Sequence, residues 1–321
     1  MTARQATDGA DIVFAMALRV AGGAVLLVMA TIGVFLLRRG WPALHEAGWS
    51  FLTTQTWEPD SHNFGIAAVL TGTMLIAAAA ITIAVPLATG FALYISEYAP
   101  QRLRRGLVNM VDLMAAVPSV VYGLWGFILL QEMLIPTARW LSLNFGWIPF
   151  LSVEGVNPDN PLERLTVYKS STFDAGIVVA LMIMPIICSI MRESFSQAPP
   201  GEREGAYALG ATRWGMVRAV VLPFARGGMI GGTMLGLGRA MGETIAVLMI
   251  ITPVFAIQPH ILQSGTNSVS ALIAARWGAA SPFELSALMA AGLTLFALTL
   301  VVNFAASMVI ARTRSGQQSE A

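Results

Sequence analysis

The chain has 321 residues, of which 56% are hydrophobic and only 12% are charged, and its net charge is +1. A soluble protein of this length needs a charged surface without large apolar patches, so this composition indicates that lipid covers much of the protein. The near-neutral charge and the lack of a basic run argue against a nucleic-acid-binding surface. The single cysteine, Cys188, excludes a disulfide within the chain. No metal site is expected either, because His45, His62 and His260 lie in three separate polar connections.

Six apolar stretches are long enough to cross a membrane, which takes about 20 mostly apolar residues in a helix. In chain order they cover residues 20–37, 65–95, 107–135, 175–191, 227–253 and 285–310. The first is longer than the apolar region of a signal peptide and is expected to remain as an anchor. Pro86 and Pro118 are expected to kink the second and third stretches. The sequence therefore predicts an all-α polytopic membrane protein with six transmembrane helices.

The basic residues predict how these helices are oriented. Six spans place both termini on one side of the membrane, together with the 96–106 and 192–226 loops. Twelve basic residues lie on that side: Arg4, Arg19, Arg102, Arg104, Arg105, Arg192, Arg203, Arg213, Arg218, Arg226, Arg312 and Arg314. Six lie on the other side: Arg38, Arg39, Arg139, Arg164, Lys169 and Arg276. By the positive-inside rule, both termini are expected in the cytoplasm.

The loop after the fourth span has the signals of two short helices. Pro200 suits a first helical turn, and Glu204 lies near the positive end of that helix dipole. Gly210 suits a C-terminal cap. Thr212 suits the N-cap of a second helix, which is expected to end before Pro223. The pattern therefore predicts two helices joined at a glycine on the cytoplasmic face.

The same loop resembles the EAA loop of ABC importer permeases. Glu204, Ala206, Gly210 and the Leu-Pro pair at 222–223 have that loop's spacing, and only Gly205 departs from it, where alanine is usual. The resemblance implies a coupling helix that docks on a cytoplasmic ATPase, with Glu204, Ala206 and Gly210 at the coupling surface. The chain has no GxxxxGK[ST] loop, so ATP and Mg are expected on a separate ATPase subunit and no cofactor on this chain.

Two charged residues, Arg239 and Glu243, lie within the predicted fifth span. Arg239 is roughly 18 Å along a helix that starts at residue 227, and an arginine at that depth costs on the order of 3 kcal/mol. Four residues apart, the two side chains are expected on one helical face. They either form a salt bridge that only offsets two burial costs, or face an aqueous pathway. In the pathway, the guanidinium fork matches two phosphate oxygens, and Glu243 either holds Arg239 or accepts a hydrogen bond from a protonated phosphate oxygen.

Glycines in the same span recur every four residues, at Gly228, Gly232 and Gly236. A row of small residues on one face of a membrane helix lets a neighbouring helix approach closely. The spacing therefore predicts tight helix packing, and it does not fit the glycine spacing of a dinucleotide-binding loop.

The run GRAMGET (238–244) is similar to the fifth-span motif of phosphate ABC importer permeases, in which the arginine and the glutamate are considered important for transport. Three further segments are similar to the C-type of the two permease subunits in that system. They are WEPDSHNFG (57–65), AAVPSVVYGLWG (115–126) and LIAARWG (272–278). The resemblance implies a non-catalytic permease subunit of an importer of inorganic phosphate in the bacterial plasma (inner) membrane.

The resemblance covers residues 50–310. It implies a type I (MetI-like) importer permease domain over 65–312, an N-terminal peripheral span and outer loop over 1–64, and a polar cytoplasmic tail over 313–321. It also implies four kinds of partner: a second, homologous permease subunit in a heterodimer, two copies of a cytoplasmic ATPase, an external phosphate-binding protein and membrane lipid.

Three other functions remain open from the sequence. The nearest is a permease for another oxyanion or small solute in the same superfamily, which the coupling loop alone does not exclude. A membrane sensor or assembly protein without transport is more distant. A secondary transporter is the third, and it would need no ATPase. A metabolic enzyme is not expected, because the chain shows no nucleophile–base set and no metal-ligand cluster.

Overall fold

The computed structural model describes residues 9–155 and 165–314, which are mostly helical. The elements named below are α1 (Gly9–Ala47), α2 (Ser50–Thr53), β1 (Trp57–Glu58), β2 (Asn63–Phe64), α3 (Ala67–Leu93), α4 (Gln101–Ala116), α5 (Ser119–Trp125), α6 (Gln131–Phe145), α7 (Thr172–Ser196), α8 (Pro200–Ala208), α9 (Arg213–Met216), α10 (Leu222–Met241), α11 (Ile245–Ile250), α12 (Val269–Arg276) and α13 (Pro282–Arg314). Most of the predicted tail, residues 315–321, lies outside the described residues.

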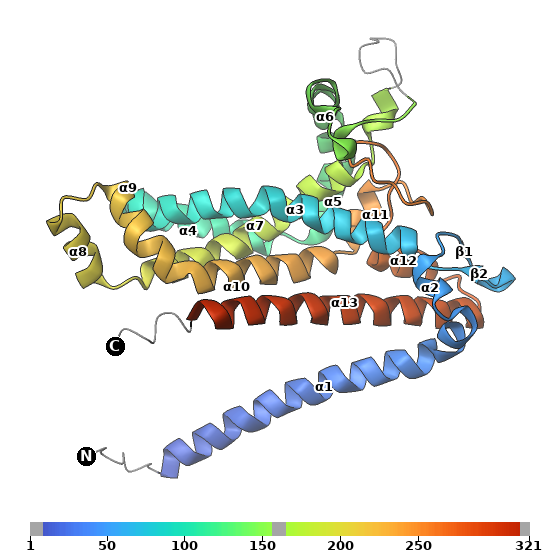
Figure 1. Ribbon diagram of the computed structural model, residues 1–321, viewed down its shortest axis with the longest axis horizontal. Helices are drawn as coiled ribbons and strands as arrows, with labels where there is room; N and C mark the ends of the chain where they lie inside the picture. The colour runs from blue at the N-terminus through green and yellow to red at the C-terminus, as the bar shows by residue number, and fades with distance from the viewer. Residues whose placement is uncertain (1–8, 156–164, 315–321) are drawn as a thin grey trace.

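Six helical stretches are long and apolar enough to cross a membrane, so the predicted number of spans is confirmed for the described residues. They are Val13–Ala47, Ala67–Tyr98, Ser119–Phe145, Thr172–Ser196, Arg213–Met241 and Pro282–Ala305. Helices α3, α4, α7, α10 and α13 lie along one common direction (Figure 1). One end of this bundle, the terminal end, holds α8, α9, the start of α1 and the end of α13. The opposite end holds α2 and the β1–β2 hairpin.

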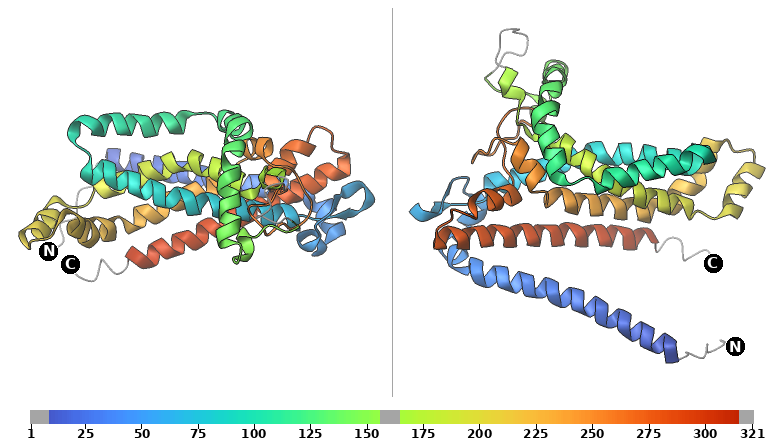
Figure 2. Two further views of the ribbon diagram at one scale, coloured as in Figure 1. Left: turned by 90° about the horizontal axis from the view of Figure 1, so that it is seen from above. Right: turned by 180° about the vertical axis from the view of Figure 1, so that it is seen from behind.

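The third predicted span, 107–135, is wrong as a single kinked helix. Helix α4 ends at Ala116, and α5 begins only after Val117 and Pro118, both of which have extended backbone angles. A proline disfavours helical geometry in the residue before it. The helix therefore ends here and the chain changes direction, instead of continuing as one kinked helix. Beyond this turn, α6 runs across the bundle direction (Figure 2, left). The apolar window Ser119–Phe145 therefore does not lie parallel to the other spans, whereas α4 does.

Helix α7 lies at the centre of the main core and contacts α3, α4 and α10. The face of α3 in this core carries a row of small side chains at helical spacing, and each is at most 2% exposed: Ala77, Ala80, Ala84, Ala88 and Ala92. Such side chains let the two helices approach closely. Pro86 does not end α3, which runs on as one helix from Ala67 to Leu93.

The glycine row on α10 packs against α7, as its spacing predicts. A Cβ atom on Gly228 would lie 1.7 Å from Oγ of Ser194, and one on Gly236 would lie 2.5 Å from Cδ1 of Ile187. On Gly232 the nearest atom would be Cγ2 of Ile190, at 3.2 Å. Larger residues at these positions would push the two helices apart.

Helix α1 lies at the edge of the bundle and packs on α13. A Cβ atom on Gly40 would lie 2.8 Å from the backbone nitrogen of Ala290, so the helices are in close contact there. From this contact α1 diverges toward the terminal end (Figure 1), and no residue of its most apolar 18-residue window is buried. Lipid or another chain must therefore cover most of α1. The division of the chain at residues 64 and 312 stays a prediction.

Candidate functional site

The fifth predicted span is broken at the residues that the sequence singled out. Helix α10 ends at Met241, Gly242 to Thr244 form a short non-helical link, and α11 begins at Ile245. The continuous span predicted over 227–253 is therefore wrong at this point. A broken membrane helix places the ends of two helices, with their partial charges, side by side inside the protein.

Arg239 lies in the last turn of α10 and is exposed. In that turn the partial negative charge of the helix end stabilises a cation. About a quarter turn away around α10 lie Gly231 and Gly238, at which an added Cβ atom would meet nothing within 4 Å. Arg239 itself is exposed although it follows the row of packing glycines, since α10 ends within the next turn.

Glu243 lies in the link between the two helices and is only 9% exposed. Its Oε1 accepts a hydrogen bond from the backbone nitrogen of Ala246 at 3.3 Å, in the first turn of α11. No ion pair within residues 9–155 and 165–314 joins it to Arg239. The prediction that both charges share one helical face is wrong, because the helix ends between them.

A buried polar cluster next to this break was missed by the sequence analysis. Ser270 Oγ donates to the backbone oxygen of Glu243 at 2.7 Å. On the same helix, α12, the backbone nitrogen of Val269 donates to Thr73 Oγ1 of α3 at 3.0 Å, and Ser268 caps the first turn. Serine ahead of an apolar run was a visible helix-start signal, but nothing in the sequence placed α12 beside Glu243.

The loop at the terminal end has the two helices that the sequence predicts. Pro200 lies in the first turn of α8, and Gly210 follows α8 with a φ of +81°, which favours glycine. Thr212 Oγ1 accepts a hydrogen bond from the backbone nitrogen of Gly215 at 3.1 Å and so caps α9. One detail is wrong: the second helix does not end before Pro223, but continues through a wider turn into α10.

The three predicted coupling residues lie in different environments. Glu204 and Gly210 are exposed, whereas Ala206 is half-buried against the main core. The outer surface of the loop also carries apolar side chains that the sequence analysis did not name, with Leu209 91% exposed and Trp214 55% exposed. Exposed apolar side chains at a polar rim are typical of a surface that binds another protein.

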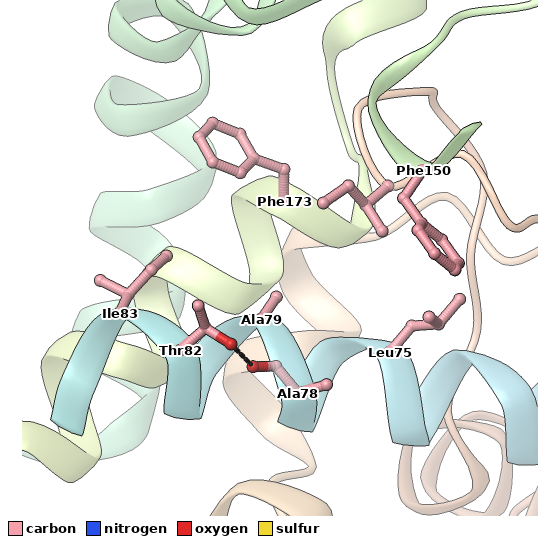
Figure 3. A pocket seen from close by; sticks show the side chains of 8 residues that line it. Leu75, Ala78, Ala79, Thr82, Ile83, Phe150 and Phe173 are labelled. Carbon is pink, nitrogen blue, oxygen red and sulfur yellow. Dashed lines mark hydrogen bonds between the residues drawn. The ribbon is translucent and has the colours of Figure 1, made fainter. Parts of the chain in front are cut away.

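An apolar cavity of about 430 Å³ lies between α3 and the loops at the opposite end (Figure 3). Phe150, Phe173 and Ile261 line it on one side, and Leu75 and Ile83 of α3 on the other. None of its lining residues carries a charge. This cavity therefore has no group that recognises an anion, and Arg239 lies elsewhere. In the part of the chain that the structure describes, no metal-binding group of histidine, cysteine and carboxylate side chains occurs.

Residues 80–315 match the family described as "Binding-protein-dependent transport system inner membrane component". The chain belongs to this family. The match includes α7, the α8–α9 loop, the broken fifth span and α13.

Relatives of this inner membrane component resemble it over nearly their whole length. The "Phosphate transport system permease protein PstC 2" of Mycobacterium tuberculosis is 39% identical over 92% of this chain and 90% of the relative. The "Phosphate transport system permease protein PstC" of Haemophilus influenzae is 37% identical over 90% of this chain and 89% of the relative. A crystal structure of a bacterial alginate ABC transporter contains a similar fold, with a TM-score of 0.59 at 16% identity over 94% of both chains. The expected type I permease architecture is thus confirmed.

Proposed function

We propose that this chain is the permease subunit of an ATP-driven importer that moves inorganic phosphate across the plasma membrane. The observation that carries this proposal is the similarity to phosphate transport permeases, which are up to 39% identical and covered over about nine-tenths of their length. An exposed arginine at the break in the fifth span supports it. Arginine matches two oxygens of a phosphate group at once, which a lysine cannot do.

In this proposal, Arg239 contacts the anion as it passes. Arg239 is exposed, so an anion can reach its guanidinium group. Glu243 acts indirectly: its hydrogen bond to the first turn of α11 fixes the break, and so fixes where Arg239 lies. Binding has to be weak enough for the anion to leave, and one exposed guanidinium meets that need.

The chain needs partners for this function. A second, homologous permease subunit would form a heterodimer with this chain, one of two ATPase copies would bind the α8–α9 loop, and an external binding protein would deliver phosphate. ATP and Mg would be used by the ATPase, and this chain would have no catalytic activity. Arg203, Arg213 and Arg218 lie in or next to the α8–α9 loop, at the same end as the start of α1 and the end of α13, so we assign that end to the cytoplasm.

A permease for another oxyanion is the second candidate. The structural similarity to an alginate transporter shows the fold alone and favours no cargo. The break with its arginine favours a small anion over a neutral solute. Phosphate and sulphate differ in that phosphate keeps a proton near neutral pH.

Uptake of labelled phosphate in a strain that lacks this chain tests the proposal. The unaltered gene should restore uptake, and excess unlabelled phosphate should compete while sulphate should not. Competition by sulphate, or no restored uptake at normal protein levels, would contradict phosphate as the cargo. A chain that transports without any ATPase would contradict the importer class.

A further inference from the structure

Helix α8 contacts the bundle through few side chains, although in the proposed function it passes movement to the spans. None of its residues is fully buried, and only Arg203 and Ala206 are half-buried, on the side facing the spans. The contact of Ala206 is apolar and therefore non-directional. Within the described residues, Arg203 makes all the side-chain hydrogen bonds that join α8 to the bundle.

Each of the three guanidinium nitrogens of Arg203 has a different acceptor. Nη1 donates to Glu97 Oε2 at 2.9 Å, Nη2 to the backbone oxygen of Phe195 at 2.5 Å, and Nε to that of Ala198 at 3.2 Å. Phe195 lies in the last turn of α7, where backbone oxygens have no partner within the helix. Glu97 lies in the wider turn that extends α3. Arg203 thus joins α8 to the ends of two spans.

The position of Glu97 is not explained by the stability of its own helix. A carboxylate near the C-terminal end of a helix is unfavourable for the helix dipole. The Glu97 side chain is also only 4% exposed, and that of Arg203 is 22% exposed, so both charges lose much of their hydration. Apolar side chains would stabilise this junction at lower cost. What the ion pair adds, and an apolar contact lacks, is a fixed direction between α8 and the end of α3. We call this contact the joint.

The neighbouring residues strengthen the same joint. Ser96 Oγ donates to the other carboxylate oxygen of Glu97, Oε1, at 2.7 Å. The next residue, Tyr98, lies under the guanidinium of Arg213 from α9, with 5.2 Å between Cζ and the ring centroid. The end of α3 therefore contacts both helices of the loop.

We propose that Glu97 and Arg203 form the joint through which movement of α8 reaches spans α3 and α7. This proposal rests on the proposed function, in which an ATPase binds α8. A planar guanidinium held by three hydrogen bonds in different directions cannot slide or pivot, as an apolar contact can. Both are positioning residues: they touch neither the anion nor ATP.

The test uses the assembled complex in proteoliposomes, with the binding protein present. The measured quantity is the number of phosphate ions transported per ATP hydrolysed, for Glu97→Gln, Arg203→Gln and Arg203→Lys. We expect this ratio to fall about fivefold or more in both glutamine variants. Arg203→Lys keeps the charge but only part of the geometry, so it should lie between them and the unaltered chain.

Glu193→Gln is the matched control, because Glu193 is an exposed carboxylate near the end of α7. Its ratio should stay within about twofold of the unaltered chain, as is usual for exposed surface positions. A purely structural pair would lower the amount of complex and leave the ratio of the remaining complex unchanged. An unchanged ratio in Glu97→Gln and Arg203→Gln, at any level of assembly, overturns the proposal.

Failure of the joint and failure of the proposed function give different results. If the unaltered complex moves no phosphate, phosphate is the wrong cargo. The joint is then tested by the rate of ATP hydrolysis alone. The measured quantity is the increase in this rate when loaded binding protein is added on the other side of the membrane. That stimulation should be lost in both glutamine variants and kept in Glu193→Gln, and its retention in all variants contradicts the joint.

Discussion

The two ends of the helical run from Arg213 to Met241 are held in different ways. At the terminal end of the bundle, the α8–α9 loop is shaped mostly by neighbours in the chain, such as the contact between Thr212 and Gly215. At the other end, the break is held by groups that are distant in the chain. Ser270, 27 residues after Glu243, donates a hydrogen bond to the backbone oxygen of Glu243. On the adjoining α12, a backbone nitrogen bonds Thr73, 196 residues earlier.

In the proposed function, this difference suits two tasks: the loop passes on movement from the ATPase, and the break holds Arg239 in place. A loop with local caps keeps its shape while it moves as a unit, because its stabilising contacts move with it. A break held by three separate elements depends on their packing, so it responds when the spans shift against each other. The ion pair between Glu97 and Arg203 is the exception in the loop, because it joins α8 to the end of α3.

The largest effect is expected at the break. Arg239→Gln should lower phosphate uptake on the order of a hundredfold, because it removes a bidentate, charge-assisted contact with the anion. The double variant Arg239→Gln with Glu243→Gln should not restore uptake, since an amide at 243 still accepts the hydrogen bond from Ala246. Arg239→Lys should keep part of the activity. Labelled-phosphate uptake per assembled complex measures all three.

Arg226→Gln is the control for that series, because Arg226 is exposed on the same helix. It should leave uptake near the level of the unaltered chain. Recovery of uptake in the double glutamine variant would mean that the two charges only neutralise each other, and the anion pathway would then lie elsewhere.

The next largest effect is expected at the loop. Gly210→Val should leave the complex in the membrane and lower uptake by about tenfold, because a φ of +81° is strained for a β-branched residue. A Cβ atom there would meet nothing within 4 Å, so the effect comes from the backbone. Gly205→Ala also meets nothing but lies in a helix, and it should be tolerated. Equal uptake by the Gly210 and Gly205 variants would argue against a shape-dependent loop.

A smaller effect on stability is expected where α10 packs on α7. Gly228→Ala should destabilise the isolated subunit by about 1–3 kcal/mol through overpacking against Ser194. Gly231→Ala should be neutral or slightly stabilising, because its Cβ atom meets nothing. Thermal unfolding in detergent should separate the two by several degrees. Equal midpoint temperatures of unfolding would show that α7 shifts to make room for the added methyl group.

The smallest effect is expected at Ser270. Ser270→Ala removes the hydrogen bond to the backbone oxygen of Glu243 and should cost about 1 kcal/mol, which lowers uptake by up to about fivefold. Ser307→Ala is the matched control, since Ser307 Oγ bonds the backbone oxygen of Asn303 on an exposed part of α13. If both variants transport like the unaltered chain, the break does not depend on α12.

Residue types and spacing were enough to predict several parts of the molecule. Six apolar stretches predicted six spans, and three glycines at a spacing of four predicted the contact between α10 and α7. Pro200, Gly210 and Thr212 predicted both helices of the loop. In each case a single segment carries the signal, because helix length, small residues and caps act within a few turns.

The break and the turn at Pro118 show what the sequence could not decide. Arg239 and Glu243 are four residues apart, which predicts one helical face, yet contacts from Ser270 favour ending the helix between them. Similarly, Pro118 allows either a kink or a turn, and the packing of α5 on α11 selects the turn. The sequence by itself determined the membrane class, the spans and the loop. Only the tertiary structure decided where helices stop and which charges meet, because groups distant in the chain satisfy backbone atoms that a continuous helix would otherwise have paired.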